Sequence, residues 1–131
     1  MPILIDTNVA IHLRDGDAAT LERLEPFVEP PLLSVISRVE LESGVYRHPQ
    51  SAPMLRVRLD RILAVLEELP FGRAEAVAYG TIVAACGFSR ARLVDRMIAA
   101  TAIAANVALV TYNPRDFRDI PGLEVLDWGS G

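Results

Sequence analysis

The sequence predicts an α/β protein with a short central parallel β-sheet and helices on both faces. Short apolar runs of strand length alternate along the chain with segments of helical periodicity. Of the 131 residues, 51% are hydrophobic and 23% are charged, which is enough apolar material for a packed core. A chain of this length fits one domain, so we expect residues 1–131 to form a single domain.

The first elements are a strand and two short helices. Ile3–Ile5 has the composition of a buried strand. Asp6 and the two polar residues after it can cap a helix that runs to about Leu13. A second short helix is expected over 15–24.

The middle of the chain begins after a pair of prolines that stops the preceding region. We expect a buried strand over 32–36, with Ser37 as the N-cap of a helix that runs to about Tyr46. Apolar residues then recur at helical spacing over 51–69, which predicts one long amphipathic helix ending at Pro70.

The last part of the chain adds two helices and two strands. A helix over 73–85 is closed by Gly87, and a nearly all-apolar helix is expected over 94–105. The remaining expected elements are a strand over 108–111, a turn over 113–117 and a strand over 123–126.

Composition excludes several classes of function. All 13 basic residues are arginine, so chemistry that needs a lysine, as in receiver-like phosphoacceptor or haloacid-dehalogenase-type domains, is disfavoured. The single cysteine, Cys86, excludes an internal disulfide and a cysteine-rich zinc site, and is expected to be a small buried residue. No apolar run is long enough for a membrane span or a signal peptide, so a cytoplasmic protein is expected.

Four acidic residues are candidates for a common site. Asp6 and Asp116 follow the expected strands at 3–5 and 108–111, where parallel sheets place functional side chains, although caps and turns also favour aspartate there. Asp95 opens a helix of small apolar residues. Glu40 and Glu42 lie about 200° apart on one helix, so only one can face the site.

We choose Glu40 over Glu42 for the site. Glu42 lies four residues after Arg38, where an exposed ion pair explains it. Glu40 has no basic partner at that spacing, and Gly44 one turn later leaves room above its carboxylate. A solvated surface position is the alternative explanation of Glu40.

Carboxylates that converge repel one another, and a hard divalent cation such as Mg²⁺ or Mn²⁺ relieves that repulsion. Such a site suits phosphodiester hydrolysis, because the ion polarises the phosphoryl oxygen and lowers the pKa of an attacking water.

Four segments of the chain resemble the PIN-domain ribonucleases, and among them the VapC-type toxins of bacterial toxin–antitoxin (VapBC) systems. The segments are LIDTNVAI, SVISRVELESG, DRMIAATAIA and LVTYNPRDFRDIPGLEVLDW, and together they span almost the whole chain. The family often has a basic residue where Tyr112 stands and an apolar residue where Arg96 stands.

The resemblance implies a PIN-like fold and an acidic metal site made of Asp6, Glu40, Asp95 and Asp116. It assigns supporting polar roles to Thr7 and Asn113. It further implies a Mg²⁺- or Mn²⁺-dependent endoribonuclease that arrests translation, forms a homodimer and is neutralised by a VapB-type antitoxin.

An acidic ribonuclease also needs positive charge near the RNA phosphates. The candidates flank two of the acids, and they are Arg90, Arg92, Arg96, Arg115 and Arg118. Ordinary solvated arginines or local ion pairs are the alternative. His12 and His48 lie outside the motifs and are expected to be structural or surface residues.

Two other functions stay open at the level of sequence. A catalytically inactive PIN-fold module could serve only to bind a protein partner, although all four candidate acids are present. A nuclease that acts on DNA is the second, because the same chemistry cleaves either backbone.

Overall fold

A computed structural model describes residues 1–129 of the chain. Its centre is a five-stranded sheet in which every neighbouring pair of strands is parallel, in the order β3-β2-β1-β4-β5. β1 is therefore the middle strand, and the chain adds strands on one side of it before crossing to the other. The strands are β1 (Ile3–Ile5), β2 (Leu32–Ser34), β3 (Glu67–Leu69), β4 (Ala108–Thr111) and β5 (Val125–Asp127).

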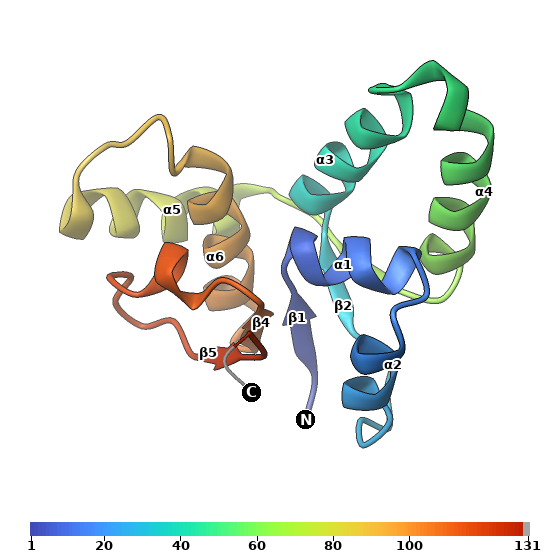
Figure 1. The fold of residues 1–131 in the computed structure, drawn as a ribbon. Coiled ribbons are helices and arrows are strands. Elements are labelled where there is room, and N and C mark those ends of the chain that lie inside the picture. Colours follow the sequence, from blue (N-terminus) through green and yellow to red (C-terminus); the bar gives the residue numbers. More distant parts are fainter. Residues whose placement is uncertain (130–131) are drawn as a thin grey trace.

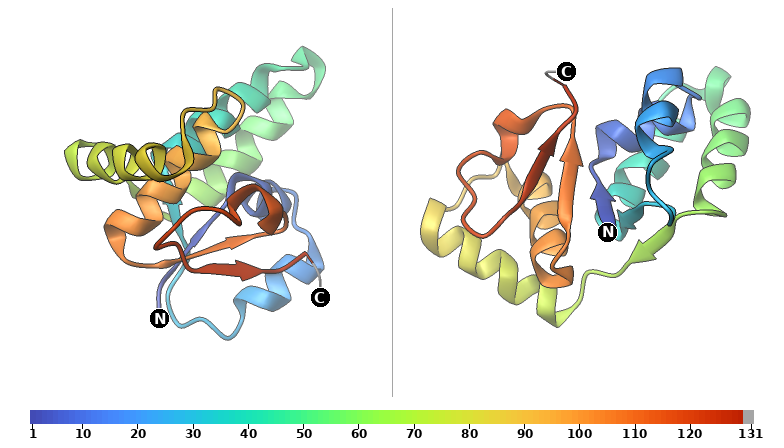
Figure 2. Two further views of the ribbon diagram at one scale, coloured as in Figure 1. Left: turned by 90° about the vertical axis from the view of Figure 1, so that its left-hand side faces the viewer. Right: turned by 90° about the horizontal axis from the view of Figure 1, so that it is seen from below.

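Helices cover both faces of this sheet, as the view from below in Figure 2 shows. On one side lie α1 (Thr7–Arg14), α3 (Val35–Tyr46) and α4 (Ala52–Leu63), and on the other α5 (Arg73–Cys86) and α6 (Leu93–Ala105) (Figure 1). The shorter helical segments are α2 (Ala18–Leu24), η1 (Pro49–Ser51) and η2 (Pro114–Phe117). The α/β architecture expected from the sequence is thus confirmed.

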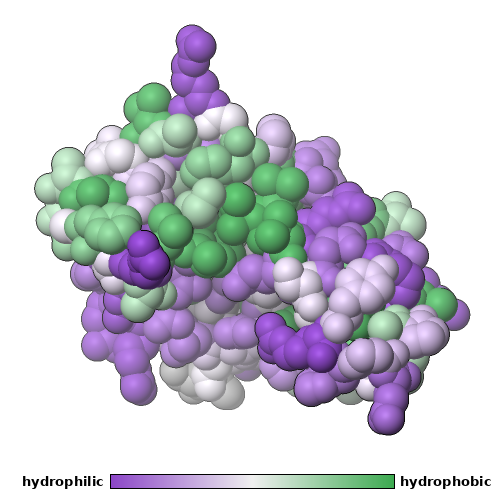
Figure 3. Space-filling model, turned by 90° about the horizontal axis from the view of Figure 1, so that it is seen from above, coloured by the Kyte–Doolittle hydropathy of each residue, from purple (hydrophilic) through white to green (hydrophobic). Residues whose placement is uncertain are grey.

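The surface combines polar and apolar regions. A broad hydrophobic area lies on the face seen from above in Figure 3, next to strongly hydrophilic regions. Several large apolar side chains on the outer helices are half or more exposed, among them Val39 on α3, Val57 on α4 and Val77 on α5. No helix within residues 1–129 is long and apolar enough to cross a membrane.

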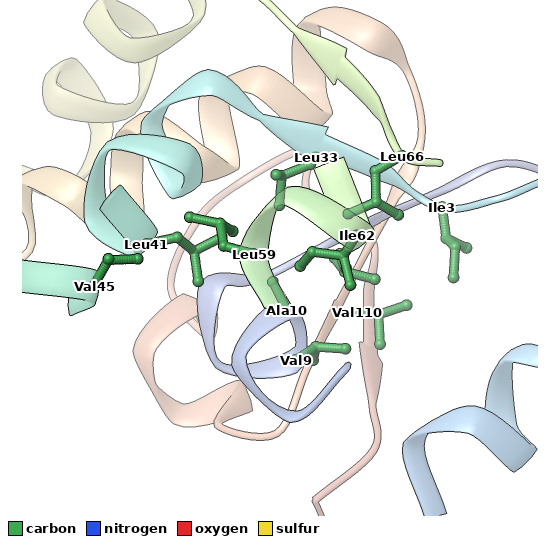
Figure 4. Close-up of a cluster of buried hydrophobic side chains, with 11 residues drawn as sticks. Ile3, Val9, Ala10, Leu33, Leu41, Val45, Leu59, Ile62, Leu66 and Val110 are labelled. Carbon is green, nitrogen blue, oxygen red and sulfur yellow. The ribbon is translucent and has the colours of Figure 1, made fainter. Parts of the chain in front are cut away.

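The core is split by the sheet into two clusters because successive side chains of a strand point to opposite faces. Ile3 and Ile5 of β1 face α1, α3 and α4, whereas Leu4 between them faces α5 and α6. Figure 4 shows the first cluster, in which Leu41 of α3 and Leu59 of α4 close over the sheet. The second cluster includes the buried side chain of Phe117 from η2.

The prediction of one helix over 51–69 is wrong for the second half of that segment. α4 ends at Leu63, and Glu67–Leu69 forms the edge strand β3, which pairs with β2. Val65, at a helical core spacing in the sequence, is 62% exposed in the link between them. Two consecutive exposed glutamates in a strand give no apolar signal, which is why periodicity missed it.

The start of α3 also differs from the expectation. β2 ends at Ser34, whose side chain accepts a hydrogen bond from the Ile36 backbone and caps α3. Ser37 is therefore not the N-cap and lies buried within the first turn of the helix. Cys86 is half-buried rather than fully buried, and its thiol donates to the Asp119 carbonyl. Smaller shifts of one to three residues affect other element ends, the largest at the start of α2.

Candidate metal centre

The candidate site lies where the order of strands in the sheet reverses, between β1 and β4. The carboxyl ends of neighbouring strands form a natural crevice at such a point. Asp6 follows β1 there and is only 4% exposed. Its Oδ1 accepts from the Thr7 backbone at 2.8 Å, and its Oδ2 accepts from the Thr111 hydroxyl, at the end of β4, at 2.9 Å. Asp6 is thus fixed across the reversal.

The pKa of Asp6 is raised because burial disfavours the charged carboxylate. The hydrogen bonds from Thr111 and Thr7 act in the opposite direction, while the negative charges of Glu40 and Asp116 add to the rise. No arginine forms an ion pair with Asp6 within residues 1–129. The buried charge is therefore only partly stabilised by the protein itself.

Glu40 reaches the same place from the second turn of α3. The Thr7 hydroxyl lies 2.5 Å from Glu40 Oε1 and 2.9 Å from the buried Ser37 Oγ. A hydroxyl has one proton, which a carboxylate oxygen can only accept, so Thr7 donates to Glu40 and Ser37 serves as its second partner. The predicted supporting role of Thr7 has a physical basis here: its backbone holds Asp6 and its side chain holds Glu40.

Asp95 stands in the first turn of α6, where the helix dipole favours a negative charge. Even so, its pKa is raised to about 6, first by burial and then by the charges of Asp6, Asp116 and Glu40. Arg92 acts in the opposite direction. These mutual effects place the four predicted acids in one electrostatic cluster.

Asp116 lies on η2, at the outer side of the cluster. The Asn113 side-chain amide donates to Asp116 Oδ2 at 2.7 Å, and the Asn113 backbone donates to the Thr111 hydroxyl at 2.9 Å. Arg92 donates to the Asp116 carbonyl at 3.0 Å, which ties η2 to the start of α6. Asn113 therefore supports Asp116 as the sequence predicts, and Thr111 is a further supporting residue that the sequence reasoning missed.

The chemistry of these side chains fits a hard divalent cation. All four are oxygen donors, and the raised pKa values of Asp6 and Asp95 reflect repulsion and burial that a cation would relieve. Within the described part of the chain, no three acidic, histidine or cysteine side chains lie close enough together to hold a metal ion as they stand. Mg²⁺ suits such an open arrangement, because it keeps several waters and binds through one or two carboxylates.

A pocket of about 260 Å³ opens from the acids and runs between α1 and α3. Asp6, Glu40 and Asp95 line one part of it. The sequence reasoning missed its other lining side chains, which include Asn8, Ile11, Arg14 and Arg47. Ile11 and Arg14 stand at helical spacing from Thr7, and Arg47 at helical spacing from Glu40, but spacing alone does not reveal that α1 and α3 face each other.

The predicted phosphate-contact arginines differ in their availability. Arg90 and Arg115 are exposed, and Arg92 is half-buried. Arg96 is only 4% exposed: it donates to the Gly87 carbonyl at 2.7 Å and lies 3.9 Å from Asp119 Oδ2. Its guanidinium is engaged inside the protein, so we exclude it from the phosphate-contact set.

Comparison with known proteins gives a consistent result. The PIN domain family model matches residues 3–123, a span that includes all four acids. Ribonuclease VapC from Rickettsia bellii (strain RML369-C) is 32% identical over 96% of both chains. Ribonuclease VapC1 from Rickettsia felis (strain ATCC VR-1525 / URRWXCal2) is 30% identical over the same shares.

A solved structure extends the likeness to three dimensions. The crystal structure of VapBC2 from Rickettsia felis bound to a DNA fragment from their promoter contains a chain that is 26% identical to this one. The match has a TM-score of 0.85 and covers 98% of this chain and 99% of that chain. The resemblance expected from the four sequence segments is thereby confirmed, and the chain belongs to the PIN-domain family, among its VapC ribonucleases.

Proposed function

We propose that this protein is a Mg²⁺- or Mn²⁺-dependent endoribonuclease that cuts RNA and inhibits translation as the toxin of a VapBC-type pair. The observation that carries the proposal is the cluster of Asp6, Glu40, Asp95 and Asp116 at the reversal of strand order, with raised pKa values at its two more buried members. The names of the relatives, Ribonuclease VapC and VapC1, support RNA as the substrate.

Each residue has a separate task in this proposal. Asp6 and Asp95 would hold the cation, with Glu40 and Asp116 completing its surroundings. When bound, the cation polarises the phosphoryl oxygen and lowers the pKa of an attacking water. Thr7 and Asn113 orient Glu40 and Asp116 through the hydrogen bonds described above. Arg92, whose side chain contacts the Asp116 carbonyl, would contact the phosphate backbone of RNA, together with Arg90 and Arg115, which stand close to these residues in the sequence.

We also propose that a VapB-type antitoxin neutralises the protein and that the protein forms a homodimer. A VapBC pair is what the similar Rickettsia felis structure contains. The exposed apolar side chains on α3, α4 and α5 offer surface that a partner can cover. Measuring the mass of the purified protein in solution, with and without its antitoxin, tests both assemblies.

The decisive experiment is cleavage of total RNA by the antitoxin-free protein in EDTA, in Mg²⁺ and in Mn²⁺, beside an Asp95→Asn variant. Asp95 is preferable to Asp6 for substitution because no hydrogen bond to its side chain is present within residues 1–129, so the change leaves the fold intact. We expect discrete cuts that require both the metal and Asp95. Mapping the fragment ends would then define the RNA and its cut site.

The same experiment separates the two alternative functions. Folded protein that binds Mn²⁺ but cuts no RNA would contradict the proposal and favour a protein-binding module. Cleavage of single-stranded DNA in preference to RNA would favour a DNA nuclease. A variant Asp95→Asn with wild-type turnover would show that the ligand set is wrong.

A further inference from the structure

The pocket beside the acids has two ends of opposite charge. α1 and α3 each contribute a stripe at the spacing i, i+4, i+7, which places three side chains on one helix face. The stripe on α3 is Glu40, Gly44 and Arg47. The stripe on α1 is Thr7, Ile11 and Arg14, with Asp6 as the N-cap of that helix. The arginines lie at the C-terminal ends of the two helices, Arg14 as the last residue of α1 and Arg47 as the C-cap of α3, whereas the acids lie nearer the N-terminal ends.

The basic end carries a surplus of positive charge. Arg14 donates to Asp15 through both Nε and a terminal nitrogen, at 3.0 and 3.2 Å, and Arg58 lies 3.7 Å from the same carboxylate. One acid therefore serves two arginines. Arg47 is exposed and has no ion pair or hydrogen bond of its side chain among residues 1–129. An unpaired guanidinium at a pocket wall is suited to bind a phosphate.

The floor between the two ends is open. A side-chain carbon built on Gly44 meets no atom within 4 Å, so the absence of a side chain there leaves free space in the pocket. Glu40 and Arg47 are seven residues apart on α3, which is roughly 10 Å along a helix axis. This separation of about two helical turns leaves room along the pocket for a second phosphate beside the one at the acids.

We propose that the pocket between α1 and α3 binds the RNA phosphate next to the one that is cut, through Arg47 with Arg14 beside it. This inference rests on the proposed ribonuclease function and adds a substrate-binding subsite to it. It gives the RNA a direction across the molecule: the scissile phosphate lies at the acids, and the flanking phosphate lies over Gly44 toward the end of α3. None of the sequence-predicted arginines occupies this position.

Binding is tested first in the Asp95→Asn background, where the RNA stays intact. The probe is a short fluorescent single-stranded RNA of mixed sequence, and its affinity is measured by anisotropy over a range of salt concentrations. Arg47→Ala should weaken binding roughly three- to tenfold and reduce the slope of log affinity against log salt by about 0.7, the loss of one phosphate contact. The matched control is Arg61→Ala, another exposed arginine that lies on α4 and lines no part of this pocket.

A second variant blocks the pocket without changing any charge. Gly44→Leu should abolish most binding of the same RNA probe, while Gly44→Ala, which adds one methyl group, should retain it. In the protein that retains Asp95, both Gly44 variants should bind Mn²⁺ as tightly as the protein with Gly44, as measured by calorimetry, because neither substitution alters an acid. If Gly44→Leu does not fold, as judged by its thermal unfolding, the Arg47 measurements decide alone.

Kinetics separate this inference from the function on which it rests. In the active protein, Arg47→Ala should raise KM for RNA cleavage with kcat unchanged, because a flanking phosphate is bound equally before and during the reaction. Arg47→Lys should restore part of the loss. A salt slope and KM equal to those of Arg61→Ala would overturn the subsite, whereas an active protein would still support the ribonuclease. No cleavage by the unsubstituted protein would instead contradict the proposed function.

Discussion

Two glutamates of α3, only two residues apart, have opposite surroundings. Glu42 accepts from Arg56 at 2.5 and 3.2 Å and from Arg38 at 3.3 Å, and these arginines also pair with Asp60 and Glu68. The pKa of Glu42 is lowered, chiefly by Arg56. Glu40 instead accepts from a threonine hydroxyl and faces other carboxylates.

The difference separates acids whose charge is balanced by arginines from acids whose charge the protein leaves largely unbalanced. Around Glu42 the arginines neutralise every nearby carboxylate, so no uncompensated negative charge remains there to bind a cation. Around Glu40 the neighbours are Asp6 and Asp95, whose pKa values are raised rather than lowered. Helical spacing from Arg38 predicted the ion pair of Glu42, which is confirmed, whereas the role of Glu40 in a metal site stays a prediction.

The largest expected effect comes from removing one charge from each set and comparing activity. Asp95→Asn should lower RNA cleavage by about 10³-fold or more, since an acid at the reacting centre is lost. Glu42→Gln should leave kcat and KM within about twofold, because its carboxylate is neutralised by arginines. Rates for both variants at saturating Mn²⁺ test this pair, and equal losses would remove the distinction between the two sets.

A large effect on stability is expected at the arginine next to Asp95. Arg96→Ala should lower the free energy of unfolding by about 2–4 kcal/mol, because it removes a buried side chain and leaves the Gly87 carbonyl without its partner. Urea unfolding measures this, with the exposed Arg115→Ala as the control. A loss below about 0.5 kcal/mol would show that Arg96 does not hold the Gly87 segment.

The pH dependence of stability should reveal the repulsion at Asp95. Its folded pKa of about 6 lies above the ordinary aspartate value of 3.8, so its ionisation lowers stability as the pH rises through about 6. In EDTA, Asp95→Asn should therefore have a higher Tm than the parent at about pH 7.5, and the difference should shrink at about pH 5. The same difference at both pH values would contradict the raised pKa.

The smallest effect on stability is expected among the acids that form ion pairs with arginines, at Glu42. Glu42→Gln should lower the free energy of unfolding by about 0.5–1 kcal/mol, and less in high salt, because the ion pairs of Glu42 lie near the surface. Its pKa is lowered, so the contribution is present at neutral pH and is lost as the pH falls through the pKa of the folded state. Chemical unfolding at two salt concentrations measures it.

The sequence predicts the central strands and most helices because their apolar residues are patterned by burial. β1 and β4 are wholly buried and the middle of α6 is buried, and each of the three reads as an apolar run. β3 escapes prediction because pairing with β2 is decided by its backbone, while Glu67 and Glu68 face solvent. The start of α3 was not predicted correctly because the sequence alone makes Ser34 and Ser37 equally good N-caps.

The acids were predictable, but their surroundings were not. Asp6 and Asp95 sit at element starts that the sequence marks clearly, and Glu40 was separated from Glu42 by a local spacing rule. Thr111 contacts Asp6 from 105 residues away, and the pocket needs two helices that are distant in sequence to face each other. Arg96 was misjudged because proximity to Asp95 in the sequence does not tell which way a helical side chain points.

The bond between Thr111 and Asp6 has a consequence for how the protein comes into being. β1 pairs with β4, so the middle strand of the sheet acquires its second neighbour only after most of the chain has been synthesised. Such distant pairings form late, after the local ones. A growing chain on the ribosome therefore lacks an assembled acidic centre until η2 has emerged. The capacity of this ribonuclease to cut RNA therefore arises late in its synthesis, after β4 and η2 have joined β1.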